Sequence, residues 1–334
     1  MAKAISKNAG RGRGRPSLRQ VLQLLDEEVS LLKTTMGGLP RAVEADSILR
    51  EIWIDDVHNS TAIEGNTMTR AQVEALVERG QASASLLETL EVDGYAAAAD
   101  WIYRSAADFE GVPMAVVSEA HRRAVELVWA KQPPGTRDQP GAWRKTPVRV
   151  ARVVVSVPAA IPADLATWGD STRDLKGVHP VVHAAVHHAW FERIHPFVDG
   201  NGRVGRLILN FMLLQRGYPP AVILKAQRSR YLRGLAQADG GSPNALAEVI
   251  ARAVSGTLTR FLMPALAGEA KLVPLSTLAA RGPYPVEYLR LLVFEGKLKA
   301  VPHGNLWLSS RKWLRDYISS RDPRGRARAT TRRK

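Results

Sequence analysis

The sequence predicts a mainly α-helical protein with one β-hairpin flap, followed by a small C-terminal winged helix-turn-helix domain. Three observations support this fold class. Apolar residues recur every three or four positions through most of the 334-residue chain, as on the buried face of a helix. Residues 84–107 and 113–130 are rich in alanine, the best helix former. Within the first 270 residues, only 148–157 (VRVARVVVSV) has the β-branched composition of a strand.

Capping and breaking residues set the expected helix boundaries. Gly65-Asn66 ends one helix, and Thr69 with Gln72 three residues later has the capping-box spacing that begins another. The isolated β segment cannot build a sheet by itself, so we expect it to form a flap on the helical body. The expected helices cover residues 17–36, 43–65, a short segment after 69, 84–107, 113–130, 164–175, 180–193, 203–216, 227–238 and 243–266.

The C-terminal segment has the order helix, turn, helix, hairpin, helix, which is typical of a winged helix-turn-helix. Such modules bind duplex DNA, but they also serve as dimerisation or docking units, so a DNA partner and a homodimer both stay open. The expected helices end near 281, cover about 285–295 and cover about 310–319, and strands at 296–301 and 306–308 flank the hairpin turn.

Charge is concentrated at the two ends of the chain. Of the net +15, residues 1–20 carry six Lys/Arg and no Asp/Glu, and residues 311–334 carry ten Lys/Arg against two Asp. Basic ends indicate contact with a phosphate-rich polymer such as DNA, or a solvated tail that keeps the chain in solution. The predicted organisation is a disordered basic tail at 1–16, an N-terminal helical region at 17–110, a core domain at 111–268, the winged-helix-like domain at 271–320 and a basic tail at 321–334.

Composition excludes several classes of protein. The chain has no cysteine, which excludes disulfides, thiolate zinc sites and a cysteine nucleophile, and which fits a reducing cytoplasm. No apolar run approaches the roughly 20 residues of a membrane-spanning helix, and no apolar stretch follows the basic N-terminus as in a secretory signal. We therefore expect a cytoplasmic protein without a membrane partner.

Residues 195–206, HPFVDGNGRVGR, combine the groups that phosphate chemistry needs. Gly200-Asn201-Gly202 lies immediately before an apolar helix, where backbone N–H groups and the helix dipole form an anion cradle. Arg203 and Arg206 share a face of that helix, and their guanidinium forks suit phosphate oxygens. Asp199 can ligate a hard cation, and His195 can take a proton near neutral pH. Together these groups predict phosphoryl or nucleotidyl transfer.

The twelve residues resemble the signature of the Fic (Fido) family, HPFx[D/E]GN[G/K]RxxR, at every fixed position. The resemblance covers about residues 40–265 and implies a Fic helical core. It also implies a protein adenylyltransferase, in which a Ser, Thr or Tyr hydroxyl of a target protein attacks the α-phosphorus of ATP, keeps the AMP and releases pyrophosphate. ATP and Mg²⁺ (or Mn²⁺) are the implied substrate and metal.

The resemblance implies a role for each motif position. His195 is the general base, Asp199 holds the metal on the α- and β-phosphates, and Phe197 is the buried anchor of the loop. The segment 148–157 resembles the family flap, which aligns a target segment by strand addition. The implied nucleotide- and phosphate-binding residues are Asp199, Gly200, Asn201, Gly202, Arg203, Val204, Gly205, Arg206, Tyr231, Leu232, Leu235 and Asp239.

The adenosine end departs from the family pattern. Tyr231 and Leu235 match it, but Leu232 stands where a second Tyr is common and Asp239 where Asn is common. Because an ionised Asp accepts hydrogen bonds but cannot donate one, the nucleotide preference stays open.

A second pattern predicts autoinhibition. Residues 60–65, STAIEG, match the family's inhibitory pattern [S/T]xxxE[G/N], which implies class II of the family. Ser60 and Glu64 are four residues apart and share a helix face. The resemblance implies that Glu64 pairs with Arg206 and occupies the space of the γ-phosphate.

Three alternatives stay open. The same site could remove AMP, with Glu64 positioning a water, or transfer another phosphate-containing group. The chain could also be a DNA-binding regulator that carries a Fic core. His183 and His187 have the i,i+4 spacing of a zinc site, but no third ligand is evident.

Overall fold

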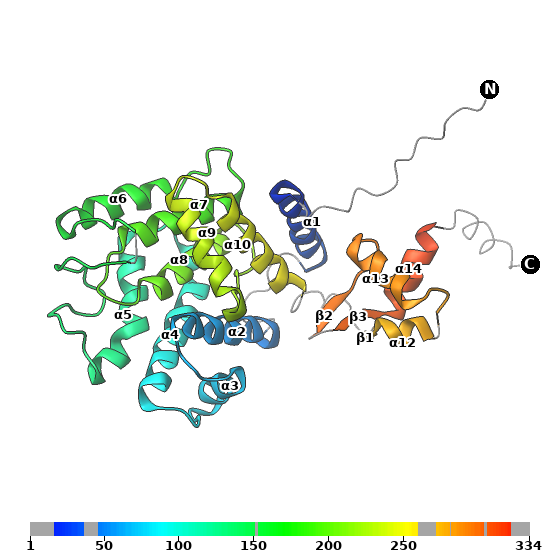
Figure 1. Ribbon diagram of the computed structural model, residues 1–334, viewed down its shortest axis with the longest axis horizontal. Coiled ribbons are helices and arrows are strands. Elements are labelled where there is room, and N and C mark those ends of the chain that lie inside the picture. Colours follow the sequence, from blue (N-terminus) through cyan, green and yellow to red (C-terminus); the bar gives the residue numbers. More distant parts are fainter. Residues whose placement is uncertain are drawn as a thin grey trace, which may run out of the picture.

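The computed structural model describes residues 17–36, 46–150, 153–259, 272–280, 282–303 and 306–321. The described residues are mainly helical, with one small sheet near the C-terminal end (Figure 1). The tail expected at 1–16, and the tail expected at 321–334 apart from Arg321, lie outside the described residues.

The larger helical body contains ten of the labelled α-helices and three short 3₁₀ turns, and the mainly α-helical part of the predicted fold class is confirmed. Two of the capping boxes at its helix starts, Thr69 with Gln72 and Ser85 with Glu88, have both reciprocal hydrogen bonds. The elements are α1 (Leu18–Met36), α2 (Asp46–Glu64), α3 (Arg70–Arg79), α4 (Leu86–Ser105), η1 (Ala106–Asp108), α5 (Met114–Lys131), η2 (Pro158–Ala160), α6 (Ile161–Ser171), α7 (Pro180–Ile194), α8 (Asn201–Gln215), η3 (Lys225–Gln227), α9 (Arg228–Asp239) and α10 (Asn244–Thr257).

Helix α8 is the centre of this body. It contacts α2, α4, α5 and α7, and its residues from Arg203 to Leu213 are all buried. Helix α4 in turn packs closely on α5, because a Cβ placed on Gly94 would lie 2.7 Å from the carbonyl oxygen of Ala124. The buried core therefore fixes the N-terminus of α8, which carries the second half of the 195–206 motif.

The expected β segment at 148–157 is the main correction to the predicted elements. The prediction of a continuous strand was wrong. In the described residues the hairpin is reduced to one antiparallel bridge between Val150 and Val153. Residues 151–152 lie outside the described residues. Val154 is 87% exposed. A β-branched run becomes a strand only where a partner strand supplies a ladder, and here Ser156 bonds to arginine side-chain and backbone groups instead. The helix expected at 243–266 is described as far as Thr257.

The C-terminal unit contains α12 (Leu275–Ala280), α13 (Val286–Phe294) and α14 (Arg311–Arg321) with strands β1 (Leu272–Pro274), β2 (Val301–His303) and β3 (Leu306–Ser310). The strands form an antiparallel sheet in the order β1-β3-β2, with Val273 opposite Ser309 and Val301 opposite Leu308. The element order matches the prediction except for β1, whose three residues gave no periodic signal, and β2, which begins at 301 rather than 296. The unit has its own apolar cluster, which includes Leu278, Leu289 and Trp313.

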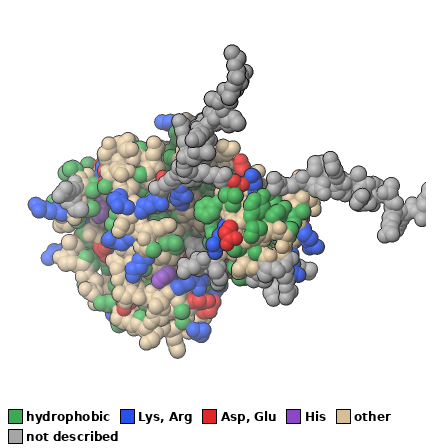
Figure 2. Space-filling view, turned by 45° about the vertical axis from the view of Figure 1, so that its right-hand side comes forward, with side chains coloured by type: hydrophobic (Ala, Val, Ile, Leu, Met, Phe, Trp, Pro, Cys, Tyr) green, Lys and Arg blue, Asp and Glu red, His purple; other side chains and the backbone are tan. Residues whose placement is uncertain are grey.

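One face of this unit is apolar at its surface. Figure 2 shows hydrophobic side chains gathered there, and Leu291 and Phe294 of α13 are exposed.

Among the residues that the structure describes, no helix is both long enough and apolar enough to span a bilayer.

The close packing of α4 on α5 gives a stability prediction. We expect Gly94→Ala to lower the free energy of unfolding by about 1–3 kcal/mol, because the new methyl group must push the α5 backbone away. The measurement is urea unfolding followed by circular dichroism. Gly256→Ala on α10 is the matched control, because no described atom lies within 4 Å of its Cβ position. Equal stability of Gly94→Ala and wild type would contradict the close packing.

Candidate functional site

The motif forms a turn between α7 and α8. His195, directly after α7, has a positive φ of 52°, and Gly200, directly before α8, has a φ of 80°. A side chain at Gly200 would also lie 3.1 Å from Val125 and 3.3 Å from His121, so glycine is required there. No side chain caps the first turn of α8. Its backbone N–H groups are therefore available to an anion, and we call Gly200–Gly202 with the guanidinium groups of Arg203 and Arg206 the anion cradle.

Side-chain contacts beneath the turn make it rigid. Asn201 accepts from the backbone N–H of Phe197 at 2.9 Å and donates to the Phe197 carbonyl at 2.8 Å. The buried Phe197 ring is stacked on His121, with 3.6 Å between ring centroids. Since both polar ends of Asn201 are used in this way, its contribution to the cradle is its backbone N–H.

His121 is a positioning residue that the sequence analysis missed. Its Nδ1 accepts from the backbone N–H of Gly141 at 2.8 Å, so its Nε2 carries the proton and donates to the Asp199 carbonyl at 3.1 Å. Burial lowers the pKa of His121 to about 3, which keeps this arrangement neutral. The contact holds the backbone of Asp199 in place.

His195 is arranged as a base. Its Nδ1 lies 3.1 Å from the Glu192 carbonyl, which can only accept, so Nδ1 is protonated and Nε2 keeps its lone pair. Burial lowers the pKa of His195, and the positive charge of Arg144 lowers it further. The imidazole is thus neutral near pH 7 and able to accept a proton at Nε2.

Arg144 is a second residue that the sequence analysis missed. Its side chain is buried and donates to the His195 carbonyl at 2.7 Å, to the Thr146 carbonyl at 3.0 Å and to the Ser156 carbonyl. Its backbone N–H also donates to the Pro196 carbonyl at 2.8 Å. One arginine therefore ties Ser156, within the segment expected to be the flap, and Thr146, just before it, to the loop that carries His195.

The inhibitory pattern and the cradle meet at Arg206, whose side chain is only 4% exposed. Its Nε donates to the Ser60 hydroxyl at 2.7 Å, and another guanidinium nitrogen donates to the Ser60 carbonyl at 3.0 Å and to Glu64 Oε1 at 2.8 Å. Glu64 Oε1 also lies 2.5 Å from where a Cβ on Gly202 would be. The end of α2 thus places a carboxylate directly on the cradle.

Arg203 is held between two carboxylates. It donates to Glu91 of α4 at 2.7 Å and to Asp199 at 2.9 Å, and its Nε is buried without a hydrogen-bond partner among the described residues. Asn66, two residues after Glu64, donates to the other oxygen of Glu91 at 3.0 Å. The sequence analysis used Asn66 only with Gly65 as a helix-ending signal, and it did not single out Glu91.

A buried polar network supports α2 one turn before Ser60. Asp56 accepts from Tyr103 at 3.1 Å, and from Tyr95 and Asn210 at 3.4 Å each. Burial raises the pKa of Asp56 to about 7. The network joins α2, α4 and α8, so the helix that carries Glu64 is fixed to the helix that carries Arg206.

The residues expected at the adenosine end lie on α9, but not all of them face open space. Tyr231 is 1% exposed, and its hydroxyl lies 2.7 Å from Nε2 of His188. Leu232 is 40% exposed, whereas Leu235 and Asp239 are half-buried. Burial raises the pKa of Asp239. Tyr231 thus holds α9 against α7. Leu232, Leu235 and Asp239 are left as the candidate contacts for a nucleobase.

The motif position Gly205 makes room for a buried carboxylate. A Cβ on Gly205 would lie 2.2 Å from Glu192 Oε1, and that oxygen has no hydrogen-bond partner among the described residues. Burial raises the pKa of Glu192 to about 7. Val204, next to it, is fully buried, so its side chain packs in the core.

A divalent metal bound to a nucleotide would fit beside Asp199. The His183/His187 pair, by contrast, does not form a zinc site. The side chain of Asp199 is 59% exposed, and one carboxylate plus substrate phosphates is the usual setting of Mg²⁺. No group of three or more His, Asp or Glu suited to a metal occurs in the described residues. The nitrogens of His187 are taken by the His183 carbonyl at 2.8 Å and the Ser171 hydroxyl at 2.9 Å.

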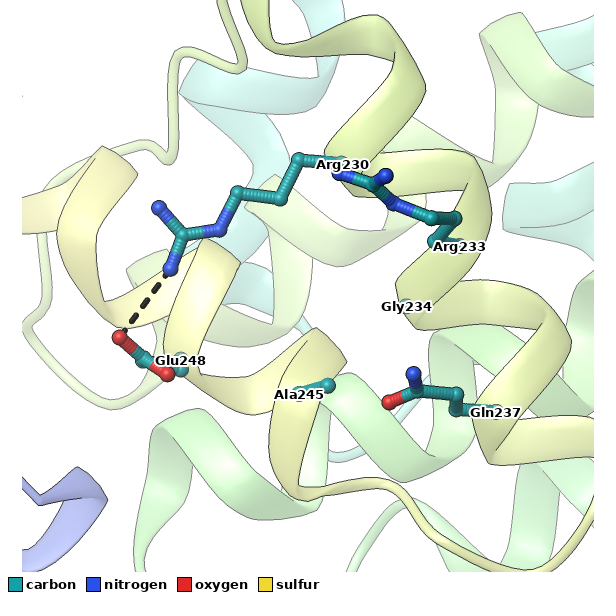
Figure 3. A pocket seen from close by; sticks show the side chains of 6 residues that line it. All are labelled: Arg230, Arg233, Gly234, Gln237, Ala245 and Glu248. Carbon is teal, nitrogen blue, oxygen red and sulfur yellow. Dashed lines mark hydrogen bonds and ion pairs between the residues drawn. The ribbon is translucent and has the colours of Figure 1, made fainter.

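A separate hollow lies between α9 and α10 (Figure 3). Arg230 in it pairs with Glu248 at 3.1 Å. No residue of the motif lines this hollow, whose lining is Arg230, Arg233, Gly234, Gln237, Ala245 and Glu248.

The sequence is similar to a known family model and to named proteins. Residues 114–213 match the model of the Fic/DOC family. "Protein adenylyltransferase Fic" of Drosophila mojavensis is 34% identical over 72% of this chain and 49% of its own length, and that of Nematostella vectensis is 28% identical over 76% and 59%. The chain therefore spans only about half the length of the Drosophila relative.

Solved structures give the same result. A Fic-1 fragment from C. elegans has a TM-score of 0.65 at 25% identity and covers 75% of this chain and 74% of its own. A Fic family protein from Desulfovibrio desulfuricans G20 has a TM-score of 0.59 at 20% identity. The match covers 89% of this chain and 96% of that protein, which shows the shared fold. The chain therefore carries a Fic/DOC family domain.

Proposed function

We propose that this chain transfers AMP from ATP to a Ser, Thr or Tyr hydroxyl of a target protein, itself included, and that Glu64 holds the activity in check. One observation carries the proposal. The Glu64 carboxylate accepts from Arg206 at 2.8 Å and lies against Gly202, in the uncapped first turn of α8. A carboxylate in an anion site marks where a phosphate would bind.

In the proposed reaction, each step is carried out by a group of this chain. Nε2 of His195 takes the proton of the attacking hydroxyl as its oxygen bonds to the α-phosphorus and the bond to pyrophosphate breaks. The N–H groups of Gly200–Gly202 stabilise the charge on the phosphate oxygens, and Arg203 and Arg206 hold the outer phosphates. Asp199 would hold Mg²⁺ or Mn²⁺, which neutralises phosphate charge when bound.

A rival activity on the same site is removal of AMP from a modified protein. In that reaction Glu64 would orient the attacking water. Transfer of another phosphate-containing group is a further variant, because the half-buried Asp239 and exposed Leu232 leave the preference for adenine open.

Duplex DNA and a homodimer are further partners that the C-terminal unit suggests. Its element order supports DNA binding, but the exposed Leu291 and Phe294 give α13 an apolar face. Since phosphate contacts need donors and cations, that face favours a protein contact over DNA.

We expect His195→Ala to lower transfer by about 10²–10⁴-fold, because no other group takes the proton of the hydroxyl. The measurement is self-labelling and lysate labelling with ATP radiolabelled at the α-phosphate, compared with ATP labelled at the γ-phosphate. His183→Ala, on the α7 helix that directly precedes His195, is the matched control and should label at the wild-type rate. Wild-type labelling by His195→Ala, or transfer of the γ-label, would contradict the proposal.

We expect Glu64→Gly to raise AMP transfer. One charge-assisted hydrogen bond is worth about 1.5–3 kcal/mol, so removing the carboxylate should raise the labelling rate about ten- to hundredfold. The double variant Glu64→Gly/His195→Ala is the control, and it should lose the gain. No gain, or a loss, would favour the rival in which Glu64 is needed for the removal of AMP.

A further inference from the structure

Asp199 has two tasks that compete. It is the exposed carboxylate beside the cradle that can hold a metal, yet its Oδ2 accepts from Arg203 at 2.9 Å. The side chain of Arg203 is only 6% exposed, so water cannot readily replace a lost carboxylate partner. A buried guanidinium without a counter-charge is costly. Arg203 can therefore release Asp199 only if another anion stays with it.

Glu91 is that second anion. Its Oε1 accepts from Arg203 at 2.7 Å on a different nitrogen from the one that binds Asp199. It comes from α4, which the core holds against α5 and α8. Unlike Asp199, its side chain is only 20% exposed, which keeps it from competing for a metal in solution.

The orientation of Glu91 is set from the end of α2. Asn66 donates to Glu91 Oε2 at 3.0 Å and to the Glu88 carbonyl at 3.2 Å. Its backbone N–H donates to the Thr61 carbonyl at 3.2 Å. The segment that places Glu64 on Arg206 thus also fixes the carboxylate that holds Arg203.

We propose that Glu91 is a positioning residue that keeps Arg203 paired and thereby frees Asp199 to exchange from Arg203 to a divalent cation on a nucleotide. This inference rests on the proposed function, since it concerns the same site. It goes beyond that function by assigning the metal readiness of Asp199 to a residue of α4 outside the motif.

The proposal predicts two changes of opposite sign. Without the charge of Glu91, Arg203 has Asp199 as its one carboxylate partner and holds it more tightly, so a divalent cation binds more weakly. The same loss leaves Arg203 with less counter-charge, so phosphates bind more tightly when no metal is present. General damage to the fold would weaken both.

The experiment compares wild type, Glu91→Gln and Asp100→Asn. The last is the matched control, because it neutralises a carboxylate of the same helix that pairs at the surface with Arg104 at 2.8 Å. Binding of Mn²⁺ in the presence of ADP is followed by the electron paramagnetic resonance signal of free Mn²⁺. Binding of ADP in chelator is measured by calorimetry. No catalytic turnover is involved in either measurement.

For Glu91→Gln we expect Mn²⁺ binding to weaken about tenfold and metal-free ADP binding to tighten by a similar factor, the size of one charge-assisted hydrogen bond. Asp100→Asn should change neither. If Glu91→Gln does not fold, Glu91→Asp, which keeps the charge but loses the reach, should shift both affinities with the same signs.

Two results would overturn the inference. Unchanged affinities in Glu91→Gln would show that Asp199 does not depend on Glu91, and weakening of both affinities would show a merely structural role. Failure of wild type to bind either ADP or Mn²⁺ with ADP would instead contradict the proposed function itself.

Discussion

The buried guanidinium of Arg206 is the constraint on which the rest of this site depends. Its side chain is 4% exposed, and a charge taken out of water must find partners inside the protein. Ser60 and Glu64 of α2 supply them, and the Asp56 network fixes α2 against α4 and α8. Because the Arg206 guanidinium is part of the anion cradle, a phosphate bound to it in the proposed reaction would compete with Glu64. In the proposed function, inhibition therefore uses the same contact that holds the end of α2 on α8.

The shape of the anion cradle depends on side chains that position the loop and are not themselves part of the cradle. Asn201 closes the loop, Phe197 stacks on His121, and His121 holds the Asp199 carbonyl. Arg144 joins the His195 loop to the segment between Thr146 and Ser156. Groups fixed before the substrate arrives need no reorganisation during the reaction, which is how electrostatic stabilisation of a transition state becomes large.

The sequence predicted the parts of this arrangement that are local. The motif is contiguous, the predicted capping box joins Thr69 to Gln72 three positions later, and Ser60 and Glu64 lie one helical turn apart, so pattern and spacing were sufficient. Arg144, His121 and Glu91 were missed because each meets the motif across a separation of 51, 78 and 112 residues, respectively. The extent of the flap was wrong because composition reports β propensity but not the presence of a partner strand.

The most direct test of the account is the affinity of ATP relative to ADP, measured by calorimetry with Mg²⁺ in His195→Ala, with and without Glu64→Gly. Loss of His195 prevents turnover, so only binding is observed. If Glu64 and the γ-phosphate compete for Arg206, loss of Glu64 tightens ATP about ten- to hundredfold, from the 1.5–3 kcal/mol of one charge-assisted hydrogen bond, and changes ADP little. Equal changes for ATP and ADP, or none for either, would contradict the competition at Arg206.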